Sequence, residues 1–213
     1  MKKIPTAIIL DFDGVILDSS ALKTDAFREF YSYFPSVFDD IMNFHLKNKG
    51  ISRYEQFSYL CELLKIPKSR QHVEKFAADF SKLIMDKLLK CPFILGAVEF
   101  IEAFYKQVPL SIASNSPHDE LLHVIDIKNI GKYFKNIEGN TGNGDKKAIL
   151  TKILIQNTYQ AATTLYIGDT LKDYEAALSV GVGFIGINNP LVIFPANILN
   201  FNNLIQVKDY LLN

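Results

Sequence analysis

The stretch Ala7-Ile8-Ile9-Leu10-Asp11-Phe12-Asp13-Gly14-Val15 decides how this chain is expected to fold. Its apolar run ends in Asp11 and Asp13, which is typical of a buried parallel strand with acidic groups at its carboxyl end. Parallel α/β sheets keep their chemistry at this edge. Two carboxylates this close repel each other unless a cation or a shared proton intervenes, so the pair predicts a metal site or an acid and base pair. The strand alone leaves open a second interpretation, in which one acid caps the next helix.

The composition of the chain is that of an ordinary globular protein. Of its 213 residues, 48% are hydrophobic and 22% are charged, which suffices for a substantial core. The 23 basic and 23 acidic residues balance to a formal charge of zero, so no net field recruits nucleic acid or an anionic membrane surface. No apolar run approaches the roughly 20 residues that cross a bilayer. We therefore expect a cytoplasmic protein whose partner is a small molecule.

Helical spacing dominates the region from residue 20 to about residue 91. Apolar side chains recur every three or four residues between Phe57 and Leu64, and again between Val73 and Leu88. Proline and glycine residues divide the region into about four helices. An all-helical block of this size predicts a separate small domain over residues 19–91, inserted into a core domain formed by residues 1–18 and 92–213.

From Pro92 onward the pattern alternates between strand and helix. This alternation predicts an α/β fold with a Rossmann-like parallel sheet flanked by helices. The C-terminal stretch, residues 194–213, is expected to form a short edge strand and a final helix. Strands are predicted over residues 109–113, 134–138, 163–167 and 182–187, and helices over residues 97–106, 119–127 and 146–156.

Polar residues gather where the predicted strands end. Because the carboxyl ends of parallel strands share one edge of a sheet, residues far apart in sequence can meet there. Several carboxylates around a hard cation, with a lysine and a hydroxyl beside them, suit phosphoryl transfer. The residues expected at this edge are Asp11, Asp13, Ser114, Asn115, Lys146, Asp169 and Asp173.

These residues resemble the four motifs of the haloacid dehalogenase-like hydrolase superfamily, in the subgroup with a helical cap after the first strand. Asp11-Phe12-Asp13-Gly14-Val15 resembles the first motif, Ser114 the second, Lys146 the third, and Gly168-Asp169 with Asp173 the fourth. The motifs occur in order over almost the whole chain. The resemblance implies a Mg²⁺-dependent phosphatase that hydrolyses a small phosphomonoester, such as a sugar or other metabolite phosphate, through an aspartyl phosphate.

The resemblance also implies a role for each residue. Asp11 would attack phosphorus, while Asp13 would protonate the leaving oxygen and later deprotonate the attacking water. Ser114 and the backbone amide of Asn115 would bind the transferring phosphoryl group. The implied Mg²⁺ ligands are the carboxylate of Asp11, the backbone carbonyl of Asp13, the carboxylate of Asp169, and Asp173 either directly or through water.

The third motif departs from a common pattern of the family. Many relatives have Lys-Pro, whereas this chain has Asp145-Lys146-Lys147-Ala148. The spacing to the apolar pair Ile149-Leu150 favours Lys146 as the phosphate lysine. Lys147 is then expected to be a solvated helix residue.

Two residues of the helical region are predicted to bind substrate. The turn that leads to Arg53 is basic and contains Gly50, and such a turn can hold a second anionic group of a substrate through Lys49 and Arg53. It is similar to the cap loop with which β-phosphoglucomutases hold the non-transferring phosphate of a sugar. The same cations can equally be solvated surface charges.

The sequence leaves two other functions open. One is a sugar-phosphate mutase similar to β-phosphoglucomutase, although Lys23 stands where those mutases carry a histidine and the Lys-Pro pair is missing. The other is a phospholigand-binding protein that keeps the fold without turnover. A dehalogenase is disfavoured by Asp13, because dehalogenating relatives need no acid there and bind no metal. As structural alternatives, Ser114 can be a helix cap and Asp173 a surface acid.

Overall fold

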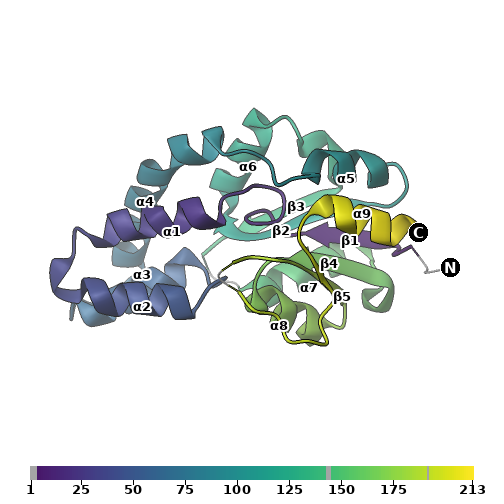
Figure 1. Cartoon of the computed structure of the whole chain (residues 1–213). Helices are drawn as coiled ribbons and strands as arrows, with labels where there is room; N and C mark the ends of the chain where they lie inside the picture. The colour runs from purple at the N-terminus through teal and green to yellow at the C-terminus, as the bar shows by residue number, and fades with distance from the viewer. Residues whose placement is uncertain (1–3, 143–144, 191) are drawn as a thin grey trace.

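A computed structural model describes residues 4–142, 145–190 and 192–213 of the protein. Its centre is a six-stranded sheet in the order β3-β2-β1-β4-β5-β6, with parallel pairing throughout (Figure 1). The predicted α/β fold class is confirmed. The strands are β1 (Ala7–Leu10), β2 (Leu110–Pro117), β3 (Asn136–Asn140), β4 (Thr164–Gly168), β5 (Gly183–Ile187) and β6 (Asn200–Phe201).

The opening strand, β1, lies between β2 and β4 in the middle of the sheet. Alternate side chains of a strand point to opposite faces. Ile8 and Leu10 therefore join the hydrophobic cluster on one face, and Ile9 joins the cluster on the other. A strand that is covered on both faces needs an apolar residue at every position, which explains the unbroken apolar run in the sequence.

Helices cover both faces of the sheet. On the face of Ile9 lie α7 (Lys146–Asn157) and α8 (Leu171–Val180). The other face packs against α5 (Ala97–Phe104), α6 (His118–Ile127) and α9 (Leu204–Leu212). This three-layer arrangement leaves the carboxyl edge of the sheet as the place where side chains from several strands can meet.

β2 is longer than the strand predicted over residues 109–113. It continues to Pro117, with a register shift against β3 between Ala113 and Pro117. The prediction ended the strand where apolar side chains give way to Ser114, but backbone pairing does not require apolar side chains. Consequently Ser114, Asn115 and Ser116 are held by a strand rather than by a loop.

An inserted helical region lies between β1 and β2, as predicted, and we call residues 20–90 the cap. Its core is aromatic: rings of Phe27, Phe30, Phe57 and Phe80 pack with centroids 4.2–6.1 Å apart. Among the described residues, no helix combines the length and the apolar character that a membrane span requires. The cap helices are α1 (Ser20–Tyr31), α2 (Phe38–Lys47), α3 (Arg53–Leu63) and α4 (Arg70–Lys90).

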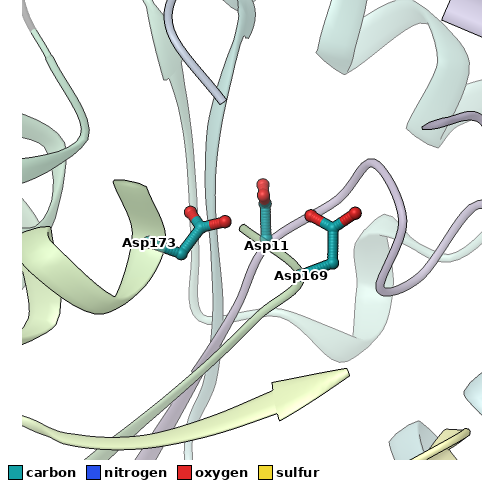
Figure 2. A group of neighbouring side chains, drawn as sticks. All are labelled: Asp11, Asp169 and Asp173. Atoms are coloured by element: carbon teal, nitrogen blue, oxygen red, sulfur yellow. The ribbon is translucent and has the colours of Figure 1, made fainter. Parts of the chain in front are cut away.

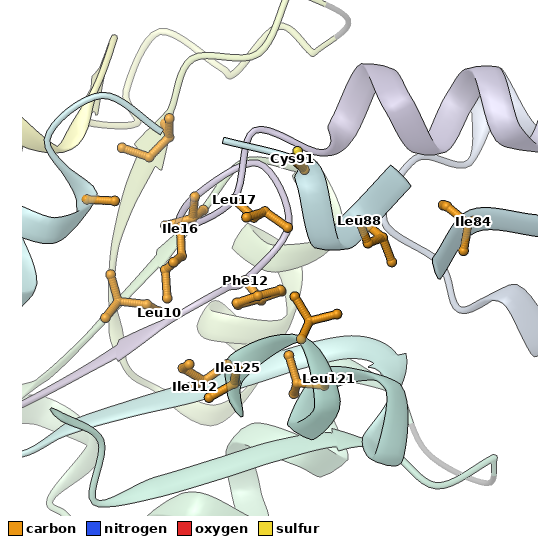
Figure 3. Packing of buried hydrophobic residues seen from close by; sticks show 14 of the residues in the cluster. Leu10, Phe12, Ile16, Leu17, Ile84, Leu88, Cys91, Ile112, Leu121 and Ile125 are labelled. Atoms are coloured by element: carbon orange, nitrogen blue, oxygen red, sulfur yellow. The ribbon is translucent and has the colours of Figure 1, made fainter. Parts of the chain in front are cut away.

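The two connections between cap and core run side by side. The backbone N–H of Asp18 donates to the carbonyl of Pro92 at 3.0 Å, and the thiol of Cys91 donates to the carbonyl of Asp18 at 3.1 Å. One hydrophobic cluster continues from the sheet into the cap, and Figure 3 shows Leu121 of α6 and Leu88 of α4 as parts of it. The cap is therefore packed against α6 as well as tethered to the core.

Candidate active site

A cavity of about 130 Å³ lies at the carboxyl edge of the sheet, lined by residues of both core and cap. The core contributes residues that follow β1, β4 and β5, the end of β2 and the start of α7, and the cap contributes residues of all four of its helices and the turn before α3. All the predicted site residues line it except Ser114 and Asp173. Those that do are Asp11, Asp13, Lys49, Arg53, Asn115, Lys146 and Asp169.

Three buried carboxylates form a cluster at this edge (Figure 2). Asp11 follows β1 directly, Asp169 follows the last residue of β4, and Asp173 lies in the first turn of α8. Figure 2 shows the carboxylate of Asp11 between the other two. Residues more than 150 positions apart in sequence therefore meet at one point, because their strands are neighbours in the sheet.

Lys146 is the cation of this cluster. Its Nζ lies 2.7 Å from a carboxylate oxygen of Asp11 and 3.2 Å from one of Asp173, and it donates to the carbonyl of Ala113 at 2.8 Å. Burial opposes the charge, but Asp11 and Asp173 outweigh it and raise the pKa of Lys146 above its usual value. Lys147 is exposed, so the structure places the predicted phosphate lysine, and not its neighbour, in the cluster.

Asp173 is held on both sides by hydrogen bonds. One of its oxygens accepts from the Tyr166 hydroxyl at 2.6 Å, and the other accepts from the backbone N–H of Thr170 at 3.1 Å. The Thr170 hydroxyl forms the reciprocal half of a capping box that begins α8. Asp173 thus starts its helix and faces Lys146 at the same time, which fixes the orientation of its carboxylate. Sequence reasoning did not find the contribution of Tyr166.

The electrostatics of the cluster disfavour three negative charges. Burial raises the pKa of Asp11 well above its usual range, and Asp173 and Asp169 raise it further against the opposing Lys146. Burial, followed by the charge of Asp173, raises the pKa of Asp169 to about 7, although Asn189 and Ser20 donate hydrogen bonds to it at 2.8 and 3.0 Å. The cluster therefore has more negative charge than Lys146 alone balances.

The donor set suits a hard divalent cation. Asp11, Asp169 and Asp173 each offer a carboxylate oxygen, and these oxygens lie within 4.8 Å of one another. Mg²⁺ prefers oxygen ligands, and its charge would offset the burial and the repulsion that raise the pKa values of Asp11 and Asp169. These three residues can therefore hold a metal ion.

Mg²⁺ is expected to stabilise the protein more at about pH 8 than at about pH 5.5. The folded protein keeps the proton of Asp169 up to a pKa of about 7, whereas an unfolded chain releases it near its ordinary value of about 4. The folded state thus binds more protons between these values, so the metal-free protein loses stability as the pH rises through this window. Mg²⁺ binds ionised carboxylates, so at pH values below about 7 it has to compete with the proton of Asp169. Melting temperatures with and without Mg²⁺ at both pH values measure the effect.

Two results bear on this expectation. An equal shift of the melting temperature at both pH values would show that the buried acids are not the Mg²⁺ ligands. In Asp169→Asn, which cannot ionise at this position, the pH dependence of the Mg²⁺ effect should shrink.

The carboxylate of Asp13 points to a different set of partners. It lies 2.6 Å from Nζ of Lys23 and accepts hydrogen bonds from the hydroxyls of Ser19 at 2.6 Å and Ser116 at 2.8 Å. Burial works against its ionised form, but Lys23 and these hydroxyls outweigh burial and lower the pKa of Asp13. Its carboxylate is thus separate from the cluster, while its backbone carbonyl stays a predicted metal ligand.

At the end of β2, Ser114 supports the backbone, whereas Asn115 and Ser116 line the cavity. Ser114 is fully buried, and its hydroxyl oxygen accepts from the backbone N–H of Ser116 at 3.1 Å. Asn115 and Ser116 line the cavity, and the Ser116 hydroxyl accepts from Nζ of Lys23 at 2.6 Å. Sequence reasoning did not assign Ser116, for which the signal is its place two residues beyond Ser114 in the same polar run.

The two predicted substrate-binding cations of the cap differ in their surroundings. Nζ of Lys49 donates to the Thr24 hydroxyl and lies 3.2 Å from Nε2 of His45. Arg53 is buried in an ion pair with Glu120 of α6, with 2.6 Å between Nη2 and Oε1. Sequence reasoning did not find Glu120, because it lies on a core helix far along the chain.

Two glycines allow the loops around the cavity to approach closely. Gly14 has a φ of +77°, and a Cβ there would lie 2.0 Å from a carboxylate oxygen of Asp169. Gly50 has a φ of +88°, and a Cβ there would lie 2.5 Å from the hydroxyl oxygen of Thr170. The Gly50 carbonyl also accepts from the Asn115 amide at 2.7 Å. Cap and core therefore touch directly beside the cavity.

The fold and the acidic cavity define a capped α/β enzyme that carries its polar groups at the carboxyl edge of a parallel sheet. Residues 8–187 match the protein family described as "Haloacid dehalogenase-like hydrolase", and the chain belongs to this family. A "Phosphorylated carbohydrates phosphatase" of Thermotoga maritima is 25% identical over 181 residues, which cover 83% of this chain and 82% of that protein. The family match, this relative and the helical cap together place the chain in the capped phosphatase subgroup.

Solved structures share the whole architecture. A predicted phosphatase from Clostridium acetobutylicum matches with a TM-score of 0.79 and 16% identity over 99% of both chains. CbbY from Rhodobacter sphaeroides, solved in complex with phosphate, matches with a TM-score of 0.77 and 14% identity over 95% of this chain and 96% of its own. At these identities the likeness concerns the fold.

Proposed function

We propose that the protein is a Mg²⁺-dependent phosphatase that hydrolyses a small phosphomonoester through an aspartyl phosphate on Asp11. The observation that carries the proposal is the buried cluster of Asp11, Asp169 and Asp173 with Lys146 at the edge of one cavity. A carboxylate nucleophile splits a slow hydrolysis into two easier steps. Mg²⁺, when bound by the three carboxylates, would supply charge to balance the phosphoryl oxygens.

The proposed reaction has two steps, in which Asp11 is the nucleophile and Asp13 the acid and base. In the first, a carboxylate oxygen of Asp11 bonds to phosphorus, the bond to the ester oxygen breaks, and Asp13 gives that oxygen a proton. In the second, water attacks the phosphorus, its proton passes to Asp13, and the bond to Asp11 breaks. Lys23 keeps Asp13 ionised in this structure, which is the form that the second step needs. The first step requires that Asp13 carry a proton, and hence that its contact with Lys23 loosen.

A phosphorylated sugar is the substrate class that we propose. The support comes from the Thermotoga maritima relative, a phosphatase of phosphorylated carbohydrates, and from the polar groups that Lys49, Asn115 and Ser116 bring to the cavity. Hydroxyl groups of a sugar match such donors and acceptors.

A screen of phosphate esters that measures free phosphate, with Mg²⁺ and with EDTA, tests the function. We expect Mg²⁺-dependent release from at least one sugar phosphate and none in EDTA. Interconversion of hexose phosphates with little release of phosphate would instead identify a mutase. If no ester reacts while sugar phosphates still raise the melting temperature, the protein binds its ligand without turnover.

A further inference from the structure

We propose that Glu120 determines the substrate specificity of this site by occupying Arg53, so that a second phosphate group on the substrate is excluded. The inference rests on the proposed phosphatase function and narrows its substrate to esters that carry one phosphate. The contact between Arg53 of the cap and Glu120 of the core involves neither the carboxylate cluster nor Asp13.

The guanidinium of Arg53 is fully engaged on the side of Glu120. Nη1 donates to Oε2 of Glu120 at 2.9 Å, and Nη2 donates to Oε1 at 2.6 Å. Ser81 of α4 accepts from Nη1 at 2.7 Å and donates to Oε2 at 2.8 Å. The Phe80 ring covers the guanidinium, with its centroid 4.8 Å from Cζ. Arginine uses the same two N–H donors when it binds a phosphate group, so Glu120 occupies the positions that a phosphate would take.

Arg53 lines the same cavity as Asp11 and Asp169, so it lies within reach of a molecule bound there. Both side chains of the ion pair are only 5% exposed. A substrate phosphate that took Arg53 would have to displace Glu120 and leave its carboxylate buried with the Ser81 hydroxyl but without a cation, which is strongly unfavourable. The cavity therefore opposes a second phosphate at this place, although the basic turn in the sequence suggested the opposite.

Lys49 provides the contrast. Its hydrogen-bond partners are the Thr24 hydroxyl and His45. Burial, and then the charge of Lys49, lowers the pKa of His45 to about 4, so the imidazole is neutral. Within the described residues no carboxylate forms an ion pair with Lys49. In the part of the chain that the structure describes, the cap thus presents Lys49 to the cavity as a cation without an ion pair, whereas the charge of Arg53 is neutralised by Glu120.

The test compares esters with one and with two phosphates in Glu120→Gln. Glucose 6-phosphate and fructose 6-phosphate are paired with glucose 1,6-bisphosphate and fructose 1,6-bisphosphate, and p-nitrophenyl phosphate reports on the phosphoryl site alone. We expect kcat/KM for the bisphosphates, relative to the monophosphates, to rise about 10-fold to 100-fold, because Arg53 regains a charged partner. The change should appear mainly in KM.

Two further variants separate specificity from stability. Glu138→Gln breaks another ion pair of a buried glutamate, with Lys152 at 2.7 Å and outside the cavity, and should leave the ratio unchanged. The double variant Arg53→Met with Glu120→Met removes both charges, and it should not gain bisphosphate activity. Glu120→Gln leaves Arg53 buried without an ionic partner and is expected to be less stable. Because fructose 1,6-bisphosphate can then bind Arg53, it should raise the melting temperature of this variant more than that of the wild type.

The outcomes are distinct. An unchanged ratio in folded Glu120→Gln, or an equal gain for all esters including p-nitrophenyl phosphate, overturns the specificity role. The equal gain would show that the ion pair merely restrains movement of the cap. A wild-type protein that releases no phosphate from any ester refutes the proposed phosphatase instead, while the melting temperatures with fructose 1,6-bisphosphate still report whether Glu120 controls access to Arg53.

Discussion

Asp11→Asn is expected to reduce phosphate release by about 10⁴-fold or more, because the amide cannot form the covalent intermediate. The fold should survive, since Asn has nearly the same shape and Lys146 keeps its ion pair with Asp173. The substitution also removes one buried negative charge from a cluster that Lys146 alone does not balance. The variant should therefore unfold at a temperature equal to or above that of the wild type without metal.

Turnover of the best ester and thermal unfolding in EDTA measure the two halves of this result. Asp119→Asn, at an exposed acid in the first turn of α6, is the matched control and should leave both unchanged. Turnover that persists in Asp11→Asn would refute the covalent route and point to direct attack by water. Loss of both activity and stability would mean that Asp11 is needed for folding rather than for the chemistry.

Lys146→Ala is expected to lower the free energy of unfolding by about 3–5 kcal/mol, because it leaves the facing carboxylates buried without their cation. Lys146 is 5% exposed and touches both Asp11 and Asp173, so water cannot replace it readily. Activity should fall as well, since the ammonium balances charge beside the nucleophile. Mg²⁺ should recover more stability in this variant than in the wild type, because it supplies positive charge to the same carboxylates.

Urea denaturation with and without Mg²⁺ measures this effect. Lys147→Ala removes the same side chain one position along α7, at an exposed site, and should change stability by no more than about 0.5 kcal/mol. Equal effects of the two substitutions would refute the assignment of Lys146 as the cation of the cluster. If Mg²⁺ restores the stability of Lys146→Ala but not its activity, the stabilising role of Lys146 is separate from its role in turnover.

Much of the fold could be predicted because the sheet is covered on both faces. The apolar runs at β1 and β4 follow directly from that burial, and a strand followed by an acid marks the carboxyl edge. Asp11 and Asp169 were predicted this way, whereas Lys146 was predicted from its place at the start of a helix and its spacing to Ile149-Leu150. The end of β2 was missed because Ser114 and Ser116 interrupt the apolar pattern without interrupting the backbone ladder.

The rest of the site depends on side-chain contacts between different helices and strands, which a local sequence pattern does not predict. The basic turn predicted that Arg53 either binds substrate or is a solvated charge, and only the contact of α3 with the first turn of α6 shows that Glu120 neutralises it. Likewise Lys23 was noticed only as a replacement for histidine, and its ion pair with Asp13 requires the start of α1 to lie beside the ends of β1 and β2. Tyr166 reads as an ordinary strand residue until α8 places Asp173 against its hydroxyl.

The central position of β1 has a consequence for how the protein is made. Ile8 pairs with Leu110 on one side and with Leu165 on the other, so β1 leaves the ribosome long before either neighbour exists. Pairings this distant in sequence form slowly, whereas the helices of the cap contact one another locally. During synthesis the cap can therefore fold while β1 still has two open edges, which exposes an apolar segment to aggregation. The proposed nucleophile reaches its metal-binding neighbours only after β4 has been added to the sheet.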